Sequence, residues 1–140
     1  MKRLILVLVV FLVATAPAAA GFDEGFAAYE RGDYATAYRE FLPLAQQGNA
    51  WAQGNLGVMY FMGRGVAQDY AQAVKWYRLA AEQGFAKAQN ILGVSYAFGR
   101  GVTQDYAKAV KWFRLAAEQG NADAQYNLAK MRGQGLGMTK

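Results

Sequence analysis

The sequence predicts an all-α protein in which helix-turn-helix units are stacked into a solenoid of about seven helices. The first observation is a repeat: NLGVMYFMGRGVAQDYAQAVKWYRLAAEQG ends at Gly84, and ILGVSYAFGRGVTQDYAKAVKWFRLAAEQG ends at Gly120, 36 residues later. A fixed period of about 20 to 50 residues is typical of stacked-repeat proteins. The second observation is that the apolar residues of each copy recur at spacings of three and four, which places them on one face of a helix.

Residues 1–20 are predicted to be a signal peptide. Lys2 and Arg3 form a basic start, an apolar run of eleven residues follows at 4–14, and three alanines ending at Ala20 offer a cleavage site. An uncleaved anchor is the alternative, but eleven residues rise only about 16 Å as a helix, against about 30 Å for the hydrocarbon core of a bilayer. We therefore expect an exported protein, periplasmic or secreted, that has no stable membrane insertion after cleavage.

The first predicted unit of the solenoid, residues 22–48, is a helix pair with a short loop. Its second helix carries Asp33 and Tyr34 at positions that precede Asp69 and Tyr70 by the same 36 residues. The loop before it is four residues shorter than in the later copies. A terminal repeat is often atypical in this way, because one of its sides has no neighbour.

The second predicted unit, residues 49–84, shows the pattern most clearly. A first helix is expected from Ala50 to Met62, a glycine-containing turn follows, and a second helix begins at Tyr70. Asp69 stands at the N-cap of this second helix, where its carboxylate can accept a hydrogen bond from the first turn. Gly84 is placed to end the helix in a left-handed conformation.

Gly57 interrupts the first helix of this unit, and Gly93 does the same one period later. Because glycine disfavours a helix by about 1 kcal/mol relative to alanine, its recurrence predicts the close approach of another helix backbone. Residues 85–120 are the third unit and 121–131 a half unit, so the solenoid is expected to span 21–131. The remaining residues, 132–140, are predicted to be a flexible tail.

The segment AQGNLGVMYFMGRGVAQDYAQAVKWYRLAAEQG and its copy resemble the Sel1-like repeat family, whose signature is LGxxYxxGxGVxxDxxxAxxWxxxAAxxG. The match covers nearly all of residues 49–131, while the first unit, GFAAYERGDYATAYREF, is similar to a tetratricopeptide repeat. The resemblance implies a right-handed α-solenoid that acts as a protein-interaction scaffold. Exported bacterial members commonly act in envelope assembly, signalling or host contact.

Comparison of the copies suggests where a partner would bind. The second helices are nearly identical, whereas the first helices differ along one stripe, which faces the concave side in helical-repeat proteins of this class. We expect a protein or peptide partner to bind in a groove lined by Trp51, Val58, Met62, Asn90, Val94, Phe98, Tyr126 and Lys130. The alternative is that these residues only make packing contacts particular to each end of the stack.

The composition excludes several kinds of site. There is no cysteine and no histidine, which removes thiolate metal sites and the usual general base near neutral pH. We therefore predict a non-enzyme with no cofactor, metal or catalytic residue. Without the leader, 13 basic and 10 acidic residues leave a net charge of +3, too small and dispersed to predict nucleic-acid binding. The basic strip Lys75, Arg78, Lys111 and Arg114 is expected to be solvated and partly paired with Glu82 and Glu118.

Two other functions are weighed against the scaffold. A sugar- or peptidoglycan-binding module would be supported by exposed aromatic residues and by the predicted compartment. A β-lactam-related hydrolase is suggested by one branch of the Sel1-like family, whose members carry a disulfide-linked cysteine pair in each repeat. This chain has no cysteine and so falls outside that branch.

Overall fold

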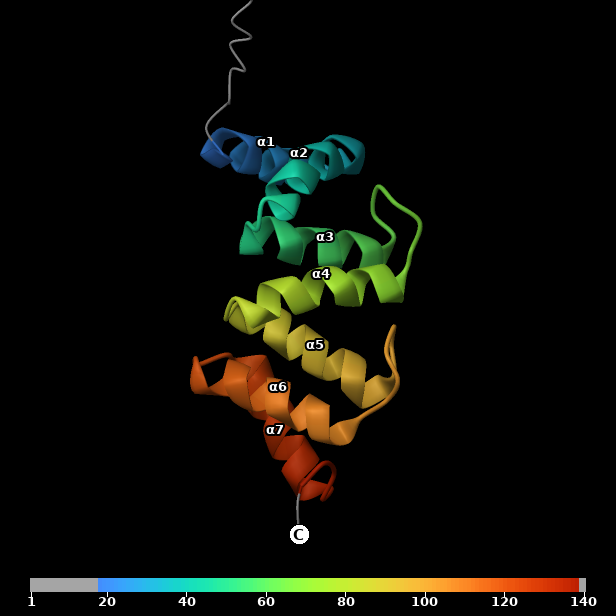
Figure 1. Ribbon diagram of the computed structural model, residues 1–140, viewed down its shortest axis with the longest axis vertical. Helices are drawn as coiled ribbons and strands as arrows, with labels where there is room; N and C mark the ends of the chain where they lie inside the picture. Colours follow the sequence, from blue (N-terminus) through green and yellow to red (C-terminus); the bar gives the residue numbers. More distant parts are fainter. Residues whose placement is uncertain (1–17, 139–140) are drawn as a thin grey trace, which may run out of the picture.

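The computed structural model describes residues 18–138, which form seven α-helices joined by short turns and loops (Figure 1). The helices are α1 (Ala18–Glu30), α2 (Tyr34–Gln46), α3 (Ala50–Met62), α4 (Tyr70–Glu82), α5 (Ala86–Phe98), α6 (Tyr106–Glu118) and α7 (Ala122–Gly133). The all-α prediction is therefore confirmed. Three residues of the predicted leader fall within α1, and the rest of it lies outside the described residues.

The helices follow one another along the molecule in chain order, and each packs mainly against its neighbours in sequence (Figure 1). In each pair we call α1, α3, α5 and α7 the first helices, and α2, α4 and α6 the second helices. The loop 31–33 of the first pair is four residues shorter than the loop 63–69 of the second, as predicted. The result is a solenoid in which the core lies between successive pairs rather than at one centre.

Short polar side chains define where the helices begin. The Asp69 carboxylate accepts a hydrogen bond from the backbone N–H of Gln72 at 3.1 Å, and Asp33 and Asp105 cap α2 and α6 in the same way. Gly84 follows α4 with a φ of +89°, in the left-handed region, as predicted. The ends of the helices are thus specified locally, by residues that recur with the repeat.

The substitution Asp69→Ala is expected to lower the free energy of unfolding by about 1 kcal/mol, because the first turn of α4 loses its side-chain acceptor. Urea unfolding followed by circular dichroism measures this loss. Asp69→Asn is the matched control, since asparagine caps helices about as well as aspartate. Equal losses in both variants would mean that the charge, and not the cap, stabilises α4.

The two longer loops between a first and a second helix, 63–69 and 99–105, contact the preceding pair. The second glycine of each loop lies against the backbone at the start of the preceding second helix: Gly65 against Tyr34, and Gly101 against Tyr70. Arg64 also donates a hydrogen bond to the Tyr29 hydroxyl, and its guanidinium lies over the Tyr34 ring at 5.5 Å. The loops therefore connect one pair to the next.

The C-terminal segment differs from the prediction of a flexible tail. α7 continues to Gly133, and Leu136 and Met138 pack against the core. Gly137 lies against the Tyr106 backbone, as Gly101 lies against that of Tyr70. The segment is thus a third copy of the inter-pair loop. In this copy Leu136 stands where the earlier copies have arginine, while Gly135 and Gly137 keep the period.

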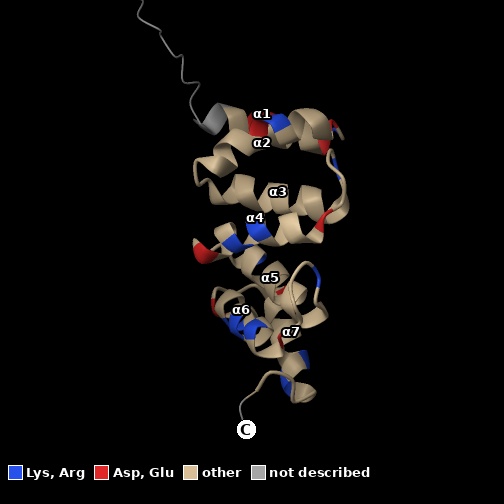
Figure 2. Ribbon diagram, turned by 45° about the vertical axis from the view of Figure 1, so that its right-hand side comes forward, with Lys and Arg blue, Asp and Glu red and all other residues tan. Residues whose placement is uncertain are grey.

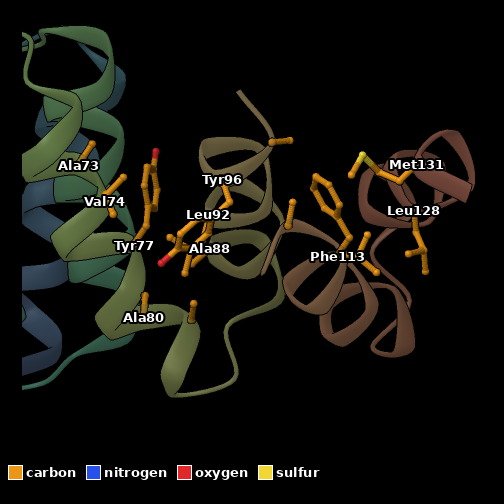
Figure 3. Close-up of a cluster of buried hydrophobic side chains, with 14 residues drawn as sticks. Ala73, Val74, Tyr77, Ala80, Ala88, Leu92, Tyr96, Phe113, Leu128 and Met131 are labelled. Atoms are coloured by element: carbon orange, nitrogen blue, oxygen red, sulfur yellow. The ribbon is translucent and has the colours of Figure 1, made fainter. Parts of the chain in front are cut away.

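Two groups of buried apolar residues form the core. One lies among α1 to α3 and includes Phe41, Leu56 and Met59, while the other extends from α4 to α7 (Figure 3). Trp76 of α4 packs against the first group. No helix within the described part of the chain is both long enough and apolar enough to span a bilayer.

The predicted backbone approach at Gly57 and Gly93 is wrong in its detail. A Cβ at Gly57 would lie 2.7 Å from the Tyr77 ring, and one at Gly93 would lie 2.6 Å from the Phe113 ring. These glycines therefore make room for a buried aromatic ring of the next helix, not for its backbone. In α7 the same position is Ala129, which is exposed.

Candidate functional site

A hollow of about 540 Å³ lies across three first helices of the described structure. α1 contributes two phenylalanines, α3 contributes four residues from Trp51 to Val58, and α5 contributes its first turns. The buried Tyr77 of α4 completes the lining. The residues that line this hollow, called the α1–α3–α5 hollow below, are Phe22, Phe26, Trp51, Gly54, Asn55, Val58, Tyr77, Phe85, Lys87, Ala88 and Ile91.

Aromatic rings dominate this hollow, and two of them are open to solvent. Phe26 is 47% exposed and Trp51 is 60% exposed, although both are large apolar side chains. Phe22 stacks on Phe26 with ring centroids 6.4 Å apart, and Trp51 lies 4.7 Å from Phe85. Exposed aromatic side chains beside a concave apolar surface are typical of binding sites.

Phe85 occupies the N-cap of α5, a position that two other first helices give to asparagine. The side chains of Asn49 and Asn121 accept backbone hydrogen bonds at 2.9 and 2.8 Å, whereas Phe85 makes no capping bond. The missing cap costs about 1 kcal/mol. Gly54 makes room for the ring, since a Cβ there would lie 3.1 Å from Phe85 Cε1. The chain therefore lacks a side-chain cap at α5, the helix whose N-cap residue lines the hollow.

Lys87 is the one charged residue that lines this hollow, and its side chain is exposed. Tyr77 stays neutral there, because burial raises the pKa of its hydroxyl above the usual range. Along the molecule, residues 21–63 carry two basic and five acidic residues, a net charge of −3. Residues 64–140 carry eleven basic and five acidic residues, a net charge of +6, and Figure 2 shows the basic residues of α4, α6 and α7.

A second, smaller hollow of about 260 Å³ lies between α5 and α7. Val94 and Phe98 of α5 line it, with Lys130 of α7 and Leu136 of the third loop. We call it the α5–α7 hollow.

The predicted site residues are divided between these places. Trp51 and Val58 line the α1–α3–α5 hollow, and Val94, Phe98 and Lys130 line the α5–α7 hollow. The other three line neither: Met62 and Tyr126 are exposed elsewhere, and Asn90 is buried.

Asn90 is not available on the open face. Its side-chain oxygen accepts a hydrogen bond from Asn127 Nδ2 at 3.0 Å, which ties α5 to α7. The hydrogen bond and the burial of Asn90 give it a packing role, so its placement in a binding groove is corrected. The single groove expected from the repeat is two separate hollows.

Several residues of the larger hollow were missed. Phe22 and Phe26 lie four apart on α1, a spacing that puts them on one helical face. Phe85 could have been found by comparing it with Asn49 and Asn121 at the same repeat position. This residue immediately precedes a helix and is not part of it.

The basic strip on the second helices is not paired as expected. Within residues 18–138, no ion pair joins Glu82 or Glu118 to it. Arg78 instead donates a hydrogen bond to the Tyr96 hydroxyl at 2.9 Å, and the Lys111 ammonium lies 5.7 Å from the Trp112 ring centre. The same part of the chain has no group of three acidic residues placed to hold a metal ion.

Comparison with known proteins gives three matches to the family model described as Sel1 repeat, at residues 52–85, 86–121 and 122–140. No curated protein matches the chain. Two solved structures are similar to it. One is c5321, described as a protective antigen of uropathogenic Escherichia coli strains with an SLR fold, at 44% identity and a TM-score of 0.83. The other is a Sel1 repeat protein from Oxalobacter formigenes, at 39% identity and a TM-score of 0.81.

These similarities extend over most of this chain but not over the related structures. The E. coli match covers 88% of this chain and 27% of that protein. The Oxalobacter match covers 85% of this chain and 49% of that protein. The chain thus corresponds to about a quarter of the first protein and half of the second.

Proposed function

The chain belongs to the Sel1 repeat family, and we propose that it is an exported scaffold of the bacterial cell envelope that binds a protein or peptide on the open face of its first helices. Sel1 repeats generally mediate protein interactions, and the family is generally non-catalytic. The proposal adds the compartment and the binding face to this general role.

The observation that carries the proposal is the α1–α3–α5 hollow with its two exposed rings, Phe26 and Trp51. Burying a large aromatic side chain contributes more to binding than burying most other residues, and such side chains concentrate in the few positions that dominate an interface. The core is already formed from other residues, so these rings are available to a partner. The predicted signal peptide supports export.

Replacing Trp51 by alanine is expected to weaken partner binding about tenfold or more, because an exposed ring that anchors an interface is removed. The partner would be captured from the envelope fraction, identified and purified, and its Kd then measured. Trp51→Ala should leave circular dichroism and melting almost unchanged. Phe98→Ala is the matched variant in the α5–α7 hollow and shows which hollow is used. Unaltered binding in both variants and in the double variant would contradict the proposal.

The alternatives give different results in the same preparation. Retention of the protein on purified cell-wall sacculi, with no protein partner captured, would favour the sugar- or peptidoglycan-binding module. Hydrolysis of a β-lactam or of murein at catalytic rates would favour a hydrolase. Either result would replace the scaffold proposal.

A further inference from the structure

We propose that the α1–α3–α5 hollow binds a peptide segment in which large apolar side chains lie beside a carboxylate. The apolar side chains occupy the aromatic hollow and the carboxylate pairs with Lys87 at its edge. This inference rests on the proposed function and names the chemistry of the partner.

The size and lining of the hollow indicate the apolar part of this segment. Its volume of about 540 Å³ lies in the range of about 300–1,000 Å³ that is usual for ligand pockets. Ten of its eleven lining residues carry no charge, and four of them are Phe or Trp. A space of this size and character takes more than one large apolar side chain.

The hollow is built by residues that are particular to this chain and not shared by its repeats. Phe85 replaces the asparagine cap found at Asn49 and Asn121, and its ring lies over Gly54. The residues equivalent to Gly54 are Asn90 in α5 and Tyr126 in α7, neither of which would leave the same space. The repeat does not require an aromatic ring at this helix end, and Phe85 leaves α5 without a side-chain cap. What the Phe85 ring supplies is an aromatic wall of the hollow beside Trp51.

The positive charge of Lys87 at the edge of the hollow indicates the carboxylate of the bound segment. Lys87 is exposed, it is the one charged residue in the lining, and no ion pair within the described residues involves it. Its equivalents in the other first helices are Trp51 and Asp123, so the positive charge is also particular to this place. A charge at the rim of an interface selects between partners more than it adds affinity. Lys87 therefore favours an acidic neighbour of the apolar side chains.

The test uses short random peptides displayed on phage and selected on the purified full chain. Enriched sequences are expected to combine adjacent large apolar residues with an aspartate or glutamate. Each is then synthesised in two forms, one with the acid and one with lysine in its place, and both Kd values are measured. The unaltered protein should prefer the acidic form by about fivefold. Lys87→Glu should reverse this preference, whereas Lys75→Glu, the same change in the basic strip on the second helices, should leave it intact.

The substitution Phe85→Asn tests the part of the proposal that concerns the apolar side chains. Asparagine restores the cap used by α3 and α7, which offsets the ring contacts that are lost, so the melting temperature should change little. Peptide binding should fall about tenfold or more. A residue with only a packing role would show the opposite pattern, a lower melting temperature with unaltered affinity.

Two kinds of result overturn the inference. One is a set of enriched peptides without a charge preference, or a preference that Lys87→Glu does not change. The other is the absence of enriched peptides, or binding that survives Phe85→Asn. A different result would contradict the proposed function itself: that no envelope partner needs Trp51 or Phe98 for binding. Capture of a partner that depends on these rings but not on Lys87 would keep the scaffold and reject the acidic segment.

Discussion

Gly101→Ala is expected to lower the free energy of unfolding by about 2–5 kcal/mol, although it adds a single methyl group. Gly101 has a φ of +74°, where an L-residue costs about 1–2 kcal/mol. The added Cβ would also collide with the Tyr70 carbonyl at the start of α4. Relieving such a collision costs a further 1–3 kcal/mol or so. Because the Tyr70 carbonyl is backbone and a Cβ is fixed to its own Cα, no side-chain rotation relieves the collision, and the loop must move away from the preceding pair.

Gly84→Ala is the matched control for this effect. Gly84 has a similar φ of +89°, but no atom lies within 4 Å of the position its Cβ would occupy. This variant should lose only the conformational part, about 1–2 kcal/mol. Urea unfolding of both variants measures the difference. Equal losses would show that the third pair does not depend on the contact between its loop and α4.

Phe113→Ala is expected to lower the free energy of unfolding by about 3–5 kcal/mol, because the ring is only 2% exposed and its loss leaves a cavity. Figure 3 shows the ring between α5 and α7, among the side chains of the larger core group. Gly93 lies directly beneath it. The ring and the glycine therefore form one packing unit.

The effect of Gly93→Ala on the free energy of unfolding should change sign when Phe113 is also replaced by alanine. In the unaltered protein Gly93→Ala places a Cβ 2.6 Å from the Phe113 ring, and overpacking of this kind costs about 1–3 kcal/mol. In the Phe113→Ala background that ring is gone, and the same substitution should raise stability by up to about 1 kcal/mol, the usual preference of a helix for alanine. A double-mutant cycle by chemical unfolding measures this coupling.

Gly133→Ala is the control for helix propensity. Gly133 ends α7 and has no atom within 4 Å of the position of a Cβ, so the substitution should be neutral or stabilising by up to about 1 kcal/mol. Additive losses at positions 93 and 113 would contradict the role of Gly93 as the place where the ring fits.

Much of the fold could be predicted because its determinants are local. Asp69 caps a helix three residues away, and Gly84 ends that helix. Each acts within one turn, so its position in the chain is sufficient to locate it. The third loop was not predicted: Leu136 replaces the arginine of the earlier copies, and only the spacing of its glycines marks the repeat.

The candidate site was harder to predict. Trp51 and Val58 were found because they vary between copies of the same helix, and they do line the larger hollow. Asn90 varies in the same way but is buried against α7, so variation alone does not distinguish an open position from a packed one. Whether any of these residues binds a partner stays a prediction.

The sequence by itself determined the 36-residue unit, the helix ends and the family, since these depend on spacing along the chain. Only the tertiary structure decided which open residues meet. Phe22, Trp51 and Phe85 belong to three different helix pairs, and they line one hollow because these pairs stack in succession. That arrangement depends on how rings such as Tyr77 fit against Gly57, a contact between helices that no spacing within one helix records.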